Sequence, residues 1–334
     1  MAELVRATRI RKVPESGGSM GVTEGLVESS ADASPLVSVV IPTVPRGAYL
    51  AEAVTSVLAQ SMSDLELLVI TNAPAVDCSC LPSDPRLRVF DQPLPGKAYA
   101  VNLGAYHARG KWLAFLDHDD VWEPDKLERQ LQLLRDWEGL PACLTQFCWI
   151  DRDGRTTATG SGQPVTLSNL LSRKLSYDWS SLLVDRALFI TLGGLDPSYR
   201  QAGDLAFLLR LHSLGQSAFV PKDCVRYRSH AENMTHTRLT EQRREGARAL
   251  ADARRLAARR HDWSLWRLSW RGSIVVRRWS ASDHMRAAAG DWAANRRSAA
   301  VGHILEALCA SPPDVIRLVV TRGAEVLCSD EQPA

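Results

Sequence analysis

Residues 110–124 read GKWLAFLDHDDVWEP, and this stretch decides the fold. Its apolar run, residues 112–116, contains no glycine or proline and is typical of a strand that is buried on both faces. The run ends abruptly in acidic residues. The stretch therefore predicts a core strand whose carboxyl end leaves the sheet in a cluster of charge.

The acidic cluster consists of Asp117, His118, Asp119 and Asp120. Because side chains alternate along a strand, we expect Asp117 and Asp119 to share one face and His118 and Asp120 the other. Two carboxylates on one side of a strand end can hold a hard divalent cation, which in turn holds phosphate oxygens. The alternative interpretation is that the acids solubilise a loop and cap a helix that begins near Pro124.

The composition is that of an ordinary globular protein. Of 334 residues, 45% are hydrophobic and 23% are charged, and 40 Lys and Arg against 38 Asp and Glu give a formal charge of +2. This balance argues against a nucleic-acid-binding protein as a whole. The arginines are unevenly placed, because residues 241–280 contain eleven of them, with no lysine and four acids.

The seven cysteines are odd in number and stand mostly in apolar surroundings, which favours a reducing compartment. No apolar run approaches the roughly 18 residues of a membrane helix, and the N-terminus has no apolar core of the signal-peptide kind. We therefore expect a cytoplasmic protein.

Predicted strands and helices alternate along the first half of the chain. Residues 1–35 show no sustained periodicity and are expected to form a loose leader. Strands are predicted at 36–41, 65–71, 86–91 and 112–116, and helices at 49–60, 96–109 and 124–137. This order predicts an α/β fold with a mostly parallel sheet and helices on both faces. Ligands bind such sheets beyond the carboxyl ends of the strands, where Thr43, Asn72 and the acidic cluster would meet.

The second half continues the sheet and then changes character. Further strands are expected at 142–150, 155–159, 180–184, near 219 and at 226–228, and helices at 185–192 and 204–213. The sheet domain would therefore span residues 36–237. Residues 238–334 are rich in Ala, Arg and Trp at helical spacing, which predicts three to five helices with breaks at 288–292 and at Pro312-Pro313.

Six short motifs follow one another in a fixed order. They are VSVVIPT at 37–43, GKAYAVNLG at 96–104, LDHDD at 116–120, GGLD at 193–196, AGD at 202–204, and YRSH at 227–230 with Asn233. Over about residues 35–236 the set resembles the GT-A fold glycosyltransferases of family 2. Each motif alone is a weak signal, but the ordered set is specific.

The resemblance implies an inverting transferase that uses a nucleotide-diphosphate sugar, with a UDP-sugar favoured. It implies that Asp119 binds Mn²⁺ or Mg²⁺, with Asp117 near the same metal or the ribose, because a cation neutralises the charge of a departing diphosphate. Asp204 would be the general base that takes the proton of the acceptor hydroxyl. A helix N-terminal carboxylate is the other interpretation of Asp204.

Further residues are implied to bind the nucleotide sugar: Pro42, Thr43, Asn72, Lys97 and His230. Lys97 is equally well explained as a solvated lysine in the first turn of a helix. A lone histidine at a strand end is usually structural, and only the motif around His230 favours a ligand role.

Three positions depart from the family pattern. Gly203 stands where a glutamate is usual, Asn72 where an acid is usual, and Val101 where an arginine is frequent. The first two keep open a catalytically silent member that binds a nucleotide or a partner. A sugar nucleotidyltransferase is a further alternative, although residues 41–46 lack the glycine-rich basic loop that such enzymes usually carry.

The acceptor is expected to be a hydroxyl-bearing saccharide, a lipid-linked molecule or a small molecule. Trp179, Tyr199 and Arg200 are candidates for its pocket, because aromatic faces pack well on sugar rings. The tail, residues 238–334, is interpreted as a helical cap whose arginine stems cover apolar surface. Its alternative interpretation is peripheral contact with an anionic membrane through tryptophans beside arginines.

Overall fold

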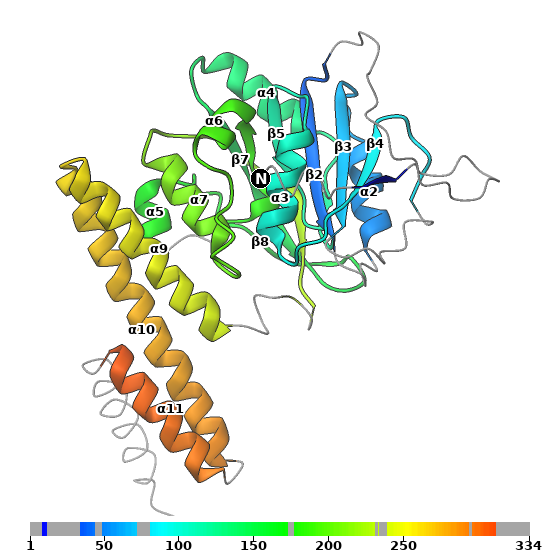
Figure 1. Ribbon diagram of the computed structural model, residues 1–334. Coiled ribbons are helices and arrows are strands. Elements are labelled where there is room, and N and C mark those ends of the chain that lie inside the picture. The colour runs from blue at the N-terminus through cyan, green and yellow to red at the C-terminus, as the bar shows by residue number, and fades with distance from the viewer. Residues whose placement is uncertain are drawn as a thin grey trace, which may run out of the picture. The chain divides into compact units, whose positions relative to one another are not determined.

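Four parallel strands form one half of the central sheet, in the order β4-β3-β2-β5 (Figure 1). They are β2 (Val37–Thr43), β3 (Leu65–Thr71), β4 (Leu87–Asp91) and β5 (Trp112–Phe115). All residues of β2, β3 and β5 are buried, as their mainly apolar sequences predict, and the polar residues Ser38 and Glu66 are buried with them. The computed structural model describes residues 9–11, 34–43, 49–71, 81–172, 177–230, 233, 239–293 and 296–311.

The other half of the sheet mixes directions. Its strands are β6 (Val121–Trp122), β7 (Ala142–Ile150), β8 (Thr156–Thr159), β9 (Leu183–Asp185) and β10 (Ala218–Arg228). The pair β7 and β10 is parallel, whereas β9 runs antiparallel to both β5 and β7 and so joins the two halves. β6 pairs with β10 and β8 with β7, both antiparallel.

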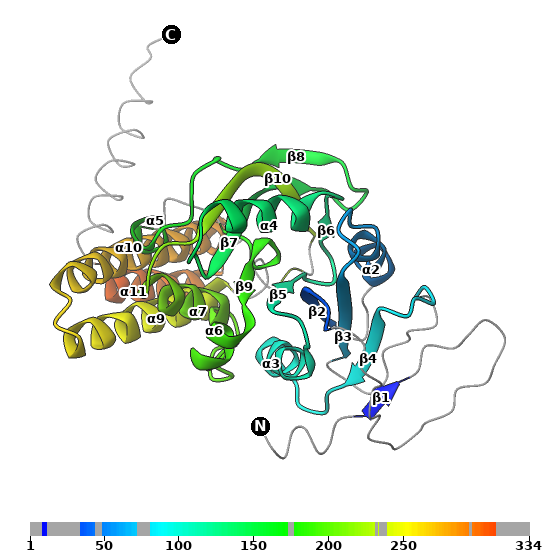
Figure 2. The same cartoon turned by 90° about the horizontal axis from the view of Figure 1, so that it is seen from above.

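Helices cover both faces of the sheet, as expected of an α/β fold (Figure 2). The helices of this region are α2 (Leu50–Leu58), α3 (Lys97–His107), α4 (Lys126–Asp136), α5 (Leu167–Ser172), α6 (Arg186–Thr191) and α7 (Gly203–His212). Helices α2 and α4 share one apolar core with Val37, Val39 and Ile41. On the opposite face Gly104 of α3 lies so close to Val40 that a Cβ would stand 2.4 Å from a valine methyl. Glycine is therefore required at position 104 because helix and strand touch there.

Several local expectations were wrong. Two separate strands were expected near 219 and at 226–228, but β10 is continuous, because bulges between Val220 and Val225 accommodate Pro221 and the polar residues that interrupt the apolar pattern. The short elements β6 and α5 were not expected. The loose leader contains β1 (Arg9–Arg11), which pairs antiparallel with β4.

The C-terminal region is helical in the residues described. Its helices are α9 (Leu239–Arg259), α10 (Trp263–Ala293) and α11 (Arg297–Ala310). The expected break at 288–292 is wrong, because α10 continues through Gly290; a glycine costs a long helix only about 1 kcal/mol. Pro312-Pro313 lies outside the described residues. No described helix carries an apolar stretch long enough to cross a bilayer.

The chain divides into two compact units: residues 1–170 with 174–238, and residues 171–173 with 239–334. The first unit holds the sheet and every motif of the resemblance. The domain boundaries expected from the sequence remain predictions.

Candidate active site

The acidic cluster forms the loop between β5 and β6, and its carboxylates have different surroundings. Asp120 is only 1% exposed, and its oxygens accept hydrogen bonds from the Ser180 hydroxyl (2.7 Å) and the Arg228 backbone N–H (3.0 Å). Burial raises the pKa of Asp120 well above its usual range, and the charges of Asp178, Asp119 and Asp117 raise it further. Asp120 therefore supports the loop from within, whereas Asp117 and Asp119 are half-buried at its surface.

Asp119 meets His230, which lies 111 residues further along the chain. His230 Nε2 is 3.1 Å from Asp119 Oδ2, and the two side chains are 12% and 16% exposed. A carboxylate oxygen is a ligand that Mn²⁺ and Mg²⁺ prefer, and a neutral imidazole nitrogen is a common ligand of transition metals. Among the described residues no three His, Cys, Asp or Glu side chains form a complete metal site. A cation held here would take its other ligands from phosphate and water, as Mg²⁺ usually does in proteins.

Arg228 holds the acidic loop in place through hydrogen bonds from its side chain. This buried side chain donates from Nε to the backbone oxygen of Asp119 (3.0 Å), from Nη1 to that of Arg152 (3.0 Å) and from Nη2 to Glu52 (2.6 Å). Its guanidinium also lies 4.2 Å from the ring centre of Tyr49, a cation–π contact. The arginine of the last family motif therefore positions the residue expected to bind metal.

Lys97, the first residue of α3, forms an ion pair with Asp117. The distance from Nζ to Oδ2 is 2.6 Å. Burial acts to lower the pKa of Lys97, but the carboxylates of Asp117, Asp204 and Asp178 outweigh it and the pKa is raised. The ammonium is thus held between the acidic loop and the start of α7. Contact of Lys97 with a nucleotide base or phosphate remains a prediction.

Asp204 lies in the first turn of α7, half-buried, and its Oδ1 accepts the backbone N–H of Leu205 at 2.7 Å. This bond fits the interpretation as a helix N-terminal carboxylate. The charge of Asp204 is also one of those that raise the pKa of Lys97, so the side chain lies within electrostatic reach of that ammonium. Its role as general base remains a prediction.

Asp178 is an ionisable residue of the site that the sequence analysis missed. It is 5% exposed, and its carboxylate accepts the Ser180 backbone N–H at 3.2 Å and caps a 3₁₀ turn (η1, Trp179–Ser181). Its Oδ2 is buried without a hydrogen-bond partner. Burial, with the charge of Asp117 second, raises the pKa of Asp178 to about 7. The Asp-x-Ser spacing that makes this cap was the available signal.

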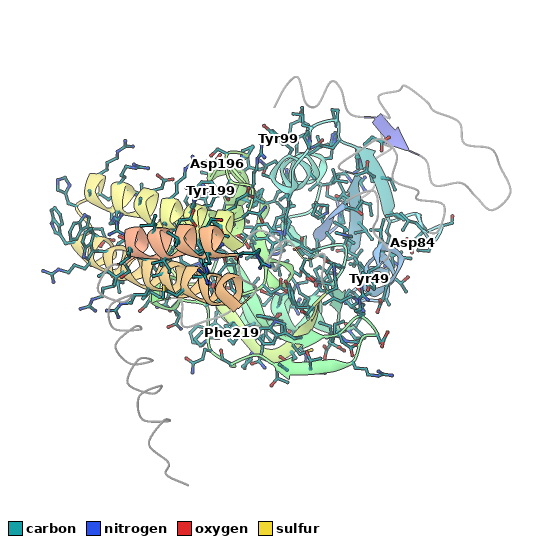
Figure 3. All side chains as sticks on the ribbon, turned by 90° about the horizontal axis from the view of Figure 1, so that it is seen from below. Tyr49, Asp84, Tyr99, Asp196, Tyr199 and Phe219 are labelled. Atoms are coloured by element: carbon teal, nitrogen blue, oxygen red, sulfur yellow. The ribbon has the colours of Figure 1, made fainter. Side chains whose placement is uncertain are left out.

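The residues proposed for the acceptor pocket differ in exposure. Trp179 is 2% exposed and its ring stacks on Phe115 at 4.6 Å, so it packs in the core. Tyr199 is also buried, in the turn that begins at Asp196 (Figure 3), whereas Arg200 is exposed. Contact of these side chains with an acceptor remains a prediction, and burial of the Trp179 ring weighs against it for that residue.

The nucleotide-binding residues expected at the strand ends are only partly described. Pro42 and Thr43 are buried at the end of β2, where Thr43 lies opposite Thr71 of β3. Asn72 lies outside the described residues. The structure thus brings Lys97, Asp117, Asp119, Asp204 and His230 into one region, and their ligands are predictions.

Two of the motifs are joined by hydrogen bonds between residues that lie 93 positions apart in the chain. Asn102 donates from Nδ2 to the Leu195 backbone oxygen (2.7 Å) and accepts the Leu195 N–H on Oδ1 (2.8 Å). Gly194 has φ +63°, and a Cβ there would lie 2.3 Å from Asn102 Oδ1. Because a side chain would meet both backbone strain and this clash, glycine is required at 194.

Comparison with known proteins agrees with these motifs. A family model described as glycosyl transferase family 2 matches residues 38–172. An uncharacterized glycosyltransferase of Rickettsia felis is 41% identical over 104 residues, which are 30% of this chain and 17% of that protein. The chondroitin synthase of Escherichia coli is 27% identical over 236 residues, 69% of this chain and 34% of that protein. The chain thus spans about a third or less of these relatives.

Solved structures share the fold. A mannosyltransferase of Pyrobaculum calidifontis, solved with GDP-Man and Mn²⁺, has a TM-score of 0.54 at 18% identity and covers 88% of this chain and 81% of its own. S. aureus TarS with UDP-GlcNAc also has a TM-score of 0.54, at 14% identity, covering 80% and 89%. The chain therefore carries a glycosyl transferase family 2 domain over residues 38–172, within a GT-A-like fold.

Proposed function

We propose that this protein transfers a sugar from a nucleotide-diphosphate donor to an acceptor hydroxyl, with inversion at the sugar carbon. The observation that carries the proposal is the pairing of Asp119 with His230 at 3.1 Å, next to the Lys97–Asp117 ion pair, at the carboxyl end of β5. Ligands of parallel sheets bind at this end. The family 2 domain and the motifs in their order support the same reaction.

Asp119 is the first ligand proposed for a divalent cation, with Asp117 and His230 beside it. Such a cation supplies Lewis-acid chemistry, since it neutralises negative charge on a diphosphate leaving group. Arg228 keeps the Asp119 backbone in place. Lys97 offers a positive charge close to the same diphosphate.

Asp204 is proposed to remove the proton of the acceptor hydroxyl during a single in-line displacement, which inverts the sugar carbon. Positioned bases of this kind contribute about 10²–10⁴ to rate. A UDP-sugar is the proposed donor, and a saccharide or lipid-linked hydroxyl the proposed acceptor. Relatives named chondroitin synthase and hyaluronan synthase support a saccharide.

A panel of UDP-, GDP- and dTDP-sugars, each with Mn²⁺ or Mg²⁺, tests the proposal through nucleotide release with and without saccharide acceptors. Asp204→Asn should lower turnover about 10²–10⁴-fold while donor binding is retained. Asp119→Asn should weaken metal-dependent donor binding. Asp153→Asn is the matched control, because this carboxylate is 73% exposed in the Asp151–Gly154 turn and should have no effect.

Two results would contradict the proposal. Pyrophosphate release from a nucleoside triphosphate and a sugar phosphate would identify a nucleotidyltransferase. Nucleotide binding without turnover of any donor would identify a catalytically silent member of the fold. Gly203, in place of the usual glutamate, is the feature that suggests this alternative.

A further inference from the structure

Helix α10 presents one continuous exposed face. This face consists of four apolar residues and four arginines. They are one, three or four positions apart in the sequence, which places them on one side of the helix. They are Trp263, Trp266, Arg267, Trp270, Arg271, Ile274, Arg277 and Arg278, all exposed, and we call them the α10 face. The apolar four are 59%, 37%, 49% and 41% exposed in chain order.

The opposite side of α10 packs against other residues of the second unit. Leu265, Ser269, Gly272, Ser273 and Val276 are all buried. Arg254 of α9 donates to the Ser273 hydroxyl at 2.7 Å. A Cβ on Gly272 would stand 3.3 Å from Leu250. Most of the α10 face therefore lies away from the side that this helix packs against α9, and Trp270 is the residue of the face that contacts Arg254 of α9.

The tryptophans on this face are ordered relative to one another. The rings of Trp266 and Trp270 are stacked, with 6.1 Å between their centroids and an angle of 3° between their planes. The Arg254 guanidinium carbon lies 5.3 Å from the centroid of the Trp270 ring. Indole rings pair a large apolar body with one N–H donor, which suits the boundary between hydrocarbon and water. Large exposed apolar groups that cluster in this way mark interaction sites.

Charge on the face has a single sign. Four guanidinium groups accompany the apolar side chains, and none of the eight residues is acidic. The nearest carboxylate in sequence, Asp262, accepts the Leu265 N–H at 3.0 Å and so caps the start of the helix. Anionic surfaces attract such arginines, and each arginine raises the affinity for the surface about fivefold.

From these observations we infer that the α10 face binds the surface of an anionic phospholipid bilayer, with the helix lying along the interface. A bilayer accommodates both halves of the pattern: Ile274 and the indoles enter the headgroup boundary while the guanidiniums contact lipid phosphates. A nucleic acid would pair with the arginines, but it offers no hydrocarbon region for a stripe of three indoles and one isoleucine. The inference concerns the second unit and does not depend on the transfer reaction.

Flotation of the full chain with vesicles tests the inference. One vesicle set contains 70% phosphatidylcholine and 30% phosphatidylserine, and the other phosphatidylcholine alone, at 50 and 300 mM NaCl. We expect binding to the anionic vesicles that weakens with salt, and much weaker binding to the neutral ones. Arg267→Gln with Arg271→Gln should lower the partition coefficient about 30-fold, and Trp266→Ser with Trp270→Ser at least tenfold.

Arg155→Gln is the matched control, because this arginine is 80% exposed and lies in the first unit. It should float like the unaltered chain, and circular dichroism should show equal helix content in all variants. The inference is overturned if the chain does not float with anionic vesicles, or if both double variants float as it does. It is also overturned if single-stranded RNA binds through these residues at salt where vesicles do not.

Discussion

Replacing Arg228 by methionine removes the charged group that holds the acidic loop while keeping most of its apolar volume. The side chain is 1% exposed and donates to the backbone oxygens of Asp119 and Arg152, each at 3.0 Å. It also donates to Glu52, whose side chain is 48% exposed and can be hydrated when the arginine is gone.

The expected loss of stability follows from these contacts. Two hydrogen bonds from a charged donor are worth about 1.5–3 kcal/mol each, and the contact with Tyr49 adds about 0.5–2 kcal/mol. Removing the buried charge offsets part of this loss of stability, because the desolvation of the guanidinium on folding is unfavourable. We expect the variant to lose about 3 kcal/mol in the free energy of unfolding and, if the proposed function holds, to need a higher metal concentration for activity.

Urea unfolding of the full chain, followed by circular dichroism and tryptophan fluorescence, measures the change. Lys222→Met is the control on the same strand, since its side chain is 46% exposed and pairs with Asp125 at the surface. The control should shift the free energy by less than about 0.5 kcal/mol. An Arg228→Met protein as stable as the control would refute the supporting role of the guanidinium.

Two further predictions concern the core and a turn. Burial lowers the pKa of Lys126 from 10.5 to about 7. Between these two pH values the unfolded chain binds more protons than the folded one. The free energy of unfolding should therefore rise with pH, by at most about 1.4 kcal/mol per pH unit. Lys126→Met should remove this slope in urea unfolding at pH 7, 8 and 9, and an unchanged slope would exclude Lys126 as its origin. Gly194→Ala should lower the melting temperature more than Gly193→Ala, because both have positive φ but only the former meets Asn102. Equal shifts would mean that the clash is relieved at no cost.

The sequence predicts the parallel half of the sheet well because its strands are buried on both faces. Their apolar runs need no knowledge of neighbours, so β2, β3 and β5 were expected within two residues of their observed ends. Strand β10 was harder, because Pro221 and Asp223 interrupt its pattern and only pairing with β7 keeps it continuous. Local patterns do not contain that long-range pairing.

The candidate site shows a similar division. The acidic cluster is plain in the sequence, but nothing local distinguishes Asp120 from Asp119. Partners 60 and 108 residues away, Ser180 and Arg228, bury the former and leave the latter at the surface. The local Asp-x-Ser spacing indicates only that Asp178 caps a turn; its place in the site comes from Asp117 and Lys97, which are near it in space and not in sequence.

Strand β9 has a mechanical consequence. It is three residues long, and its pairings with Trp112–Ala114 and with Ala142–Cys143 connect the two halves of the sheet. Stretching or partial opening of the protein would therefore concentrate at this short ladder, and slow amide exchange at Leu183 and Val184 would report that the two halves of the sheet are still joined.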